Sequence, residues 1–239
     1  VNTMSCYDVI YMLNDSLPPV LWWLHEGSYV LDEMRGAIPS TISDRISVYA
    51  ISDYTIRVLK EGGVPYKIGK LTWGVEDIPQ SKTANKKNDL ITFVILGSIE
   101  HRKGQDIVLN AIRKLKPEVL HKAEFIFVGK PLDKALVNEI KKACSENIQY
   151  IDAMPREDVL KLYEEADCII IPSRDEPMSL VAIEAAILAT PFICSDHTGV
   201  AQFVKDGENG MVFQSGNTLE LSMKITEAVE NPHLLRFMG

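Results

Sequence analysis

The chain has 239 residues, of which 46% are hydrophobic and 24% are charged. This composition is typical of globular proteins and provides material for one large or two small domains. The formal net charge of −8 and the pI of about 5.2 argue against a nucleic-acid-binding protein, because such proteins usually present basic faces.

The four cysteines, at positions 6, 144, 168 and 194, form no C-x-x-C motif and show no paired spacing. We therefore expect free thiols in a reducing compartment. No apolar run is long enough to span a bilayer, and no signal peptide is evident. The sequence predicts a cytoplasmic protein and leaves contact with the inner face of the membrane open.

The first 75 residues alternate predicted strands and helices. We expect strands over residues 6–13, 20–25, 46–51 and 67–73. Helices are expected over about 29–35 and after a cap at Ser52 or Asp53, the second ending at Gly62 and Gly63. These strands are too few for a complete doubly wound domain, so we interpret residues 1–75 as a partial Rossmann-like domain. The polar segment 76–89 is predicted to be a linker.

Residues 90–239 show a longer and more regular alternation. Predicted strands cover residues 91–96, 124–128, 148–151, 168–171, 191–194 and 210–213. Predicted helices cover residues 106–115, 134–143, 157–166, 179–189, 200–205 and 219–229. Strands that alternate with helices of this length predict an α/β fold with a doubly wound parallel sheet and right-handed crossovers.

The stretch from residue 168 to residue 195 organises the second domain as a βαβ unit. Two short apolar runs flank a segment rich in helix formers, and Pro177 suits the first position of that helix. The loop 173–178 should therefore lie at the carboxyl end of a parallel sheet, where ligands bind in open α/β folds.

Two carboxylates, Glu176 and Glu184, lie eight residues apart in this unit. Glu184 is the only charged residue between Pro177 and Ser195, and a lone buried carboxylate is costly unless a donor bonds to it. Sugar hydroxyls would serve as donors. Alternatively, Glu176 favours the helix N-terminus and Glu184 pairs with an Arg or Lys or faces solvent. The spacing alone leaves both interpretations open.

The first strand of the second domain is followed by the turn Gly97-Ser-Ile-Glu-His-Arg-Lys-Gly104. Glycines allow backbone to approach a ligand closely, and the following helix presents its positive end to an anion. Lys103 supplies a mobile cation, and Arg102 a planar one able to hold phosphate oxygens in pairs. A solvated basic pair is the alternative interpretation of this turn.

These motifs together resemble retaining, family-4-like glycosyltransferases of the GT-B architecture. Glu176 and Glu184 match the E-x7-E pattern of that family, and Lys103-Gly104 matches its Lys-Gly pair. Ser98 stands where the family has an Arg. The likeness covers nearly all of the chain from about residue 46 and, more weakly, the part before it. It implies that part of the amino-terminal, acceptor-side domain is missing.

The resemblance also implies roles for individual residues. Glu176 would hold hydroxyls of the donor sugar, and Glu184 those of the ribose. His25, followed by an acid at the end of a predicted strand, would approach donor sugar and acceptor, so His25 and Glu176 are the catalytic candidates. The donor diphosphate would meet the turn after the first strand and the helix start, through Gly97, Ser98, Arg102, Lys103, Met178, Ser179 and Leu180.

The implied reaction is transfer of a sugar from a UDP- or GDP-sugar to a glycan or lipid-linked acceptor, with retention of configuration. The nucleotide sugar is the donor substrate, and no cofactor or metal is expected, since the sequence contains no Asp-x-Asp motif. A non-catalytic nucleotide-sugar-binding module and a nucleotide-sugar epimerase are the alternatives. A paired-carboxylate glycosidase would leave Lys103-Gly104 without a role.

Overall fold

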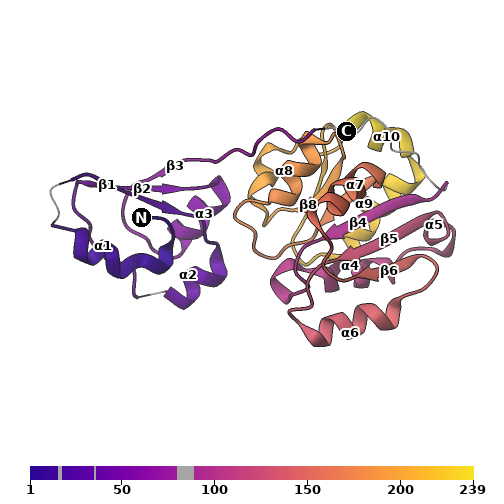
Figure 1. Ribbon diagram of the computed structural model, residues 1–239, viewed down its shortest axis with the longest axis horizontal. Coiled ribbons are helices and arrows are strands. Elements are labelled where there is room, and N and C mark those ends of the chain that lie inside the picture. Colours follow the sequence, from indigo (N-terminus) through magenta and orange to yellow (C-terminus); the bar gives the residue numbers. More distant parts are fainter. Residues whose placement is uncertain (16–17, 35, 80–88) are drawn as a thin grey trace. The chain divides into compact units, whose positions relative to one another are not determined.

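The computed structural model describes residues 1–15, 18–34, 36–79 and 89–239. The chain divides into two compact units (Figure 1). The first unit comprises residues 1–75 together with 175–179 and 198–202, and the second comprises 76–174, 180–197 and 203–239. Each unit has its own hydrophobic core. Most of the predicted linker, residues 80–88, lies outside the described residues, and the predicted domain boundaries stay a prediction.

The first unit is built on a parallel sheet of three strands in the order β1-β2-β3. The strands are β1 (Val20–Leu24), β2 (Ile46–Ala50) and β3 (Ile68–Lys70). The helices are η1 (Met4–Cys6), α1 (Tyr7–Leu13), α2 (Ser28–Met34) and α3 (Asp53–Glu61). Ser52 caps α3 as predicted, because its hydroxyl oxygen accepts a hydrogen bond from the backbone N–H of Thr55 at 3.1 Å.

The predicted strand over residues 6–13 is wrong, because this segment lies in η1 and α1. Ile10 is fully buried, whereas Tyr11 and Met12 are 56% and 80% exposed. Burial of a single face suits a short amphipathic helix, and a short apolar run does not by itself distinguish helix from strand. The predicted strand 67–73 shortens to the three residues of β3.

The second unit contains six parallel strands in the order β6-β5-β4-β7-β8-β9 (Figure 1). The strands are β4 (Ile91–Leu96), β5 (Ala123–Val128), β6 (Ile148–Ile151), β7 (Cys168–Ile171), β8 (Phe192–Ser195) and β9 (Met211–Phe213). The helices are η2 (His101–Lys103), α4 (Gln105–Ile112), α5 (Pro117–Leu120), α6 (Lys134–Ala143), α7 (Arg156–Glu165), α8 (Leu180–Ile187), α9 (Thr218–Glu230) and α10 (Pro232–Met238), with η3 (Gly199–Phe203) falling largely in the first unit. The predicted doubly wound parallel sheet is confirmed.

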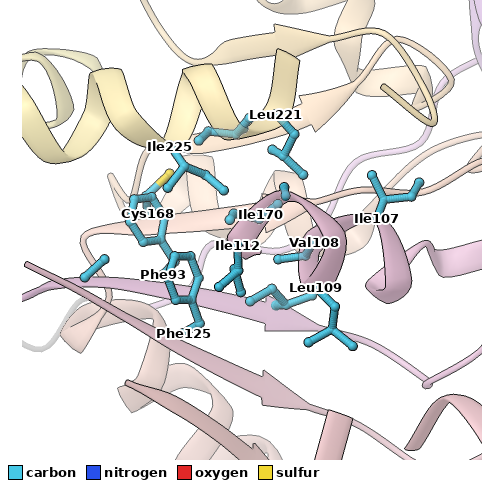
Figure 2. Packing of buried hydrophobic residues seen from close by; sticks show 14 of the residues in the cluster. Phe93, Ile107, Val108, Leu109, Ile112, Phe125, Cys168, Ile170, Leu221 and Ile225 are labelled. Atoms are coloured by element: carbon cyan, nitrogen blue, oxygen red, sulfur yellow. The ribbon is translucent and has the colours of Figure 1, made fainter. Parts of the chain in front are cut away.

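The core of the second unit lies between the central strands and helices α4 and α9 (Figure 2). Phe93 of β4 and Phe125 of β5 stack with ring centroids 5.2 Å apart. Buried aliphatic side chains of both helices, Leu109 and Ile225 among them, pack against these strands. Cys168 is fully buried in the same cluster, and burial raises the pKa of its thiol. All four cysteines are free.

Pro177 is not the first residue of a helix, because α8 begins only at Leu180. Glu176 instead forms a parallel β-bridge with Thr198, and its carbonyl oxygen accepts a hydrogen bond from Gly199 N–H at 2.7 Å. A Cβ added at Gly199 would lie 1.7 Å from the carbonyl oxygen of Pro177. Contacts with residues 198–199 therefore hold this segment extended, against the helix-starting preference of proline.

Candidate functional site

The two central strands of the second unit, β4 and β7, are neighbours from which the chain proceeds in opposite directions. From β4 the sheet grows through β5 to β6, and from β7 it grows through β8 to β9. In doubly wound folds, ligands bind at the carboxyl ends of the strands where the order reverses. The segments that leave these two ends are residues 97–104 after β4 and 172–174 after β7.

These two segments are in direct contact through Gly104. Its φ of +75° lies in the left-handed region, and a Cβ at this position would lie 2.1 Å from the carbonyl oxygen of Pro172. Any other residue would clash with backbone and strain its own conformation. The glycine that the sequence pairs with Lys103 therefore allows the turn to approach the end of β7.

Lys103 closes the short helix η2 within this turn. A Cβ added at Gly97 would lie 3.9 Å from both Cδ and Cε of Lys103, so the aliphatic stem of the lysine passes over Gly97. Gly97 has a φ of +134°, which only glycine adopts without strain. The structure thus brings together two of the predicted diphosphate-binding residues.

The other two predicted residues of the turn, Ser98 and Arg102, share one partner that the sequence analysis missed. The Ser98 hydroxyl donates to Oε1 of Glu100 at 2.6 Å, and Nη2 of Arg102 donates to the same oxygen at 3.2 Å. Gln105 fixes the same loop by donating to the Ser98 carbonyl oxygen at 2.9 Å. A carboxylate therefore lies beside the cation that was expected to meet phosphate.

Arg174 and Asp106 were also missed, and they join the two segments. Both terminal nitrogens of Arg174 donate to the carboxylate of Asp106, at 2.8 and 2.6 Å. Arg174 also donates from Nη1 to the carbonyl oxygen of His101 at 2.7 Å. Burial would raise the pKa of Asp106, but hydrogen bonds and charge from Arg174, together with His101, hold that pKa below its ordinary value.

Glu184 is buried on α8 and has protein donors on α7. Its carboxylate accepts from Nη2 of Arg156 at 2.7 Å and from the hydroxyl of Tyr163 at 3.0 Å. Burial and the Glu184 charge raise the pKa of the Tyr163 hydroxyl, so it stays protonated and able to donate. Arg156 and Tyr163 are seven residues apart, which puts them on one helix face, and this spacing could have indicated them.

His25 follows β1 in the first unit. One ring nitrogen, Nε2, hydrogen-bonds Oδ1 of Asn2, and the ring lies 4.3 Å from that of Trp23 between centroids. Burial lowers the pKa of His25 and outweighs the opposite effect of the Glu26 carboxylate. A neutral imidazole near neutral pH can accept a proton.

Asp175, next to Glu176 in sequence, is 2% exposed and lies among residues of the first unit. Its carboxylate accepts hydrogen bonds from the backbone N–H groups of Ser28 at 3.2 Å and Tyr29 at 3.0 Å, and from the hydroxyl of Tyr54 at 2.7 Å. The carboxylate thus satisfies donors at the start of α2.

The predicted site residues fall in both units. His25, Glu176, Met178 and Ser179 belong to the first unit, and Glu176, Met178 and Ser179 are buried. Gly97, Ser98, Arg102, Lys103, Leu180 and Glu184 belong to the second unit. Leu180 is 49% exposed at the start of α8.

Among the described residues, no three or more His, Cys, Asp or Glu side chains are grouped so that they could hold a metal ion. Within the same part of the chain, every helix is too short or too polar to cross a membrane.

A family model described as glycosyl transferases group 1 matches residues 76–239. This region includes strands β4 and β7, where the strand order reverses, together with the Lys103 turn and Glu184. The chain belongs to this family. Among curated relatives, the chain is 30% identical over 159 residues to a D-inositol 3-phosphate glycosyltransferase of Segniliparus rotundus, covering 63% of the chain and 34% of that protein. It is 27% identical over 146 residues to an uncharacterized glycosyltransferase of Methanocaldococcus jannaschii, covering 61% of the chain and 40% of that protein.

Solved glycosyltransferase structures show the same fold. The chain superposes on Anabaena HepE in complex with UDP-glucose with a TM-score of 0.75 and 17% identity, covering 92% of this chain and 65% of that one. For sucrose-phosphate synthase from Thermosynechococcus elongatus the TM-score is 0.77 at 17% identity, with coverages of 99% and 65%. The chain spans less than two thirds of each of these relatives and structures.

Proposed function

We propose that this chain is the donor-binding part of a retaining, metal-independent glycosyltransferase of the family-4-like group. The whole enzyme would transfer a sugar from a UDP- or GDP-sugar to a glycan or lipid-linked acceptor in the cytoplasm or at the inner face of the membrane. The observation that carries the proposal is the Lys103 turn at the reversal of strand order, inside the region that matches the family. The UDP-glucose complex of Anabaena HepE, whose fold is shared, supports this donor class.

In the proposed reaction, the bond between the anomeric carbon of the sugar and a diphosphate oxygen breaks, and its electrons leave with the diphosphate. The acceptor hydroxyl oxygen forms the new bond to that carbon, and its proton passes to the departing diphosphate. Lys103 and the N–H groups near Leu180 would stabilise the charge that develops on the diphosphate. The Glu184 carboxylate would accept hydrogen bonds from the ribose hydroxyls, and Glu176 and His25 would contact the donor sugar.

Isothermal titration calorimetry with UDP, GDP and their sugars tests the proposal. We expect Lys103→Met and Glu184→Gln each to lower the affinity for the preferred nucleoside diphosphate by at least about tenfold. Lys114→Met and Glu118→Gln change exposed residues of the same unit and serve as matched controls. Wild-type affinity in both site variants would contradict the proposed binding site.

Because the relatives are much longer than this chain, we propose that it binds nucleotide weakly and transfers little sugar by itself. Efficient turnover by this chain alone would contradict that proposal.

One observation favours a second candidate, a non-catalytic binding module. The family Arg is replaced by Ser98, and the nearby Arg102 is paired with Glu100. Sugar-dependent binding that is lost in Glu176→Ala favours the transferase, and absence of sugar dependence favours the module. For an epimerase of the same architecture, product analysis on the full-length protein without acceptor gives the decision.

A further inference from the structure

The turn that carries Lys103 is held by one residue of the neighbouring loop, Arg174. The side chain of Arg174 donates to the carbonyl oxygen of His101 at 2.7 Å. Its backbone N–H donates to the next carbonyl oxygen, that of Arg102, at 2.8 Å. Two successive carbonyl groups immediately before Lys103 therefore have the same residue as their donor.

The helix that follows the turn is held by the same side chain. Asp106 lies in the first turn of α4, and its carboxylate accepts hydrogen bonds from both terminal nitrogens of Arg174. Such bidentate, charge-assisted pairs are strong and geometrically specific. The two side chains are 22% and 26% exposed, so water screens the pair less than it screens a surface ion pair. Lys103 thus lies between two points, His101 and Asp106, that are both attached to Arg174.

Arg174 is itself anchored to the neighbouring strand. The hydroxyl of Ser195, the last residue of β8, donates to the carbonyl oxygen of Ser173. Nδ1 of His197 hydrogen-bonds the carbonyl oxygen of Arg174 at 3.0 Å. The loop after β7 is therefore attached to the sheet, and a displacement of the Lys103 turn would break several of these bonds together.

We propose that Arg174 and Asp106 are positioning residues that fix the Lys103 turn against the loop after β7 and thereby set the affinity of the site for diphosphate. This inference rests on the proposed function for the identity of the ligand, whereas the claim that the two residues fix the backbone of the turn does not depend on it. Neither residue needs to contact the nucleotide. Their effect reaches it through the backbone of residues 101–104, which determines where the Lys103 ammonium group lies.

The test compares Arg174→Met and Arg174→Lys with Arg113→Met, which removes an exposed arginine at the end of the same helix. Affinities are measured by calorimetry for UDP and GDP and for uridine and guanosine. We expect Arg174→Met to lower diphosphate affinity about tenfold while nucleoside affinity changes less than about twofold. Arg174→Lys keeps the charge but loses the paired geometry, so it should restore only part of the affinity.

Hydrogen–deuterium exchange of the backbone amides of residues 101–106 provides the second measurement, and it requires no ligand. Faster exchange in both Arg174 variants, with wild-type rates in Arg113→Met, supports the inference. Unchanged exchange, or unchanged diphosphate affinity beside faster exchange, overturns it. If the wild-type chain binds no nucleotide, the proposed function fails and the effect on affinity fails with it, while exchange still decides whether Arg174 fixes the turn.

Discussion

Two arginine–carboxylate pairs in the second unit show how the same chemistry serves different ends. Arg174 meets Asp106 through two hydrogen bonds, and both side chains are about three-quarters buried. Arg156 meets Glu184 through one hydrogen bond, with the arginine 61% exposed and the carboxylate 10% exposed. The first pair is embedded in the fold, and the second has one partner in solvent.

The difference follows from what each carboxylate has to do. Asp106 joins two backbone segments, and a bidentate pair resists rotation as well as separation. Glu184 keeps the buried hydroxyl of Tyr163 as a partner when Arg156 moves away. Under the proposed function, a ribose hydroxyl would replace Arg156 at the Glu184 carboxylate, and the Tyr163 hydroxyl would remain as a second donor. On the same basis, the first pair would support the site and the second would exchange with ligand.

The largest expected effect is a loss of stability when the pair between Arg174 and Asp106 is removed. Arg174→Met removes three side-chain hydrogen bonds, two of them to a carboxylate, so we expect a loss of about 2 kcal/mol in the free energy of unfolding. Urea unfolding followed by far-ultraviolet circular dichroism measures this loss. Tryptophan fluorescence serves as a reference, because Trp22, Trp23 and Trp73 all lie in the first unit.

The control for that measurement is Arg113→Met, which should change the free energy of unfolding by less than about 0.5 kcal/mol. A loss of the same size in the control, or a shift confined to tryptophan fluorescence, would place the effect outside the Arg174 pair. Equal losses in the Arg174 and Arg156 variants would end the distinction between the two pairs.

A smaller effect concerns the pH dependence of the Arg174 pair. Because the pKa of folded Asp106 lies below its ordinary value of 3.8, this carboxylate contributes stability above about that pH, and the contribution is lost as the pH falls through the lower folded pKa. Arg174 and His101 are the groups whose charge lowers this pKa. The gap in unfolding free energy between wild type and Arg174→Met should therefore narrow between pH 5 and pH 3.

We expect that narrowing to be on the order of 1 kcal/mol, because the partly exposed pair is screened by solvent. Denaturant titrations at pH 5, 4 and 3 measure it. As a control, the difference in unfolding free energy between Asp106→Asn and the double variant Asp106→Asn/Arg174→Met should not narrow over the same pH range. A gap that widens on acidification would contradict the assigned direction of the pKa shift.

The two pairs also mark the limit of what the sequence could predict. Regular elements with clear alternation were predicted well, and the bounds of β6, β7 and α6 are confirmed. The position of the Lys-Gly turn after β4 follows from the same pattern, whereas the order of the strands was not predicted. In contrast, the predicted strand 6–13 lies in η1 and α1. A run as short as CYDVIYML is compatible with a helix or a strand, and tertiary packing determines which of the two forms.

Side-chain partners distant in sequence could not be predicted in the same way. Arg174 and Asp106 are 68 residues apart, and Arg156 and Glu184 are 28 apart. Pairing depends on which loops meet at the edge of the sheet, and no local rule expresses that. Glu184 was expected to need a donor because it is a lone carboxylate among apolar residues. Which donors it finds became clear only from the hydrogen bonds between α7 and α8.

The smallest expected effect completes the comparison. Arg156→Met removes a partner that is 61% exposed and makes one hydrogen bond, so we expect the free energy of unfolding to change by less than about 0.5 kcal/mol. Because Arg156 and ribose would compete for the same carboxylate oxygen, affinity for the preferred nucleoside should stay the same or rise. Urea unfolding and calorimetry measure both quantities. A destabilisation as large as that of Arg174→Met, or a lost nucleoside affinity, would show that Arg156 is a fixed part of the site and not an exchangeable partner of Glu184.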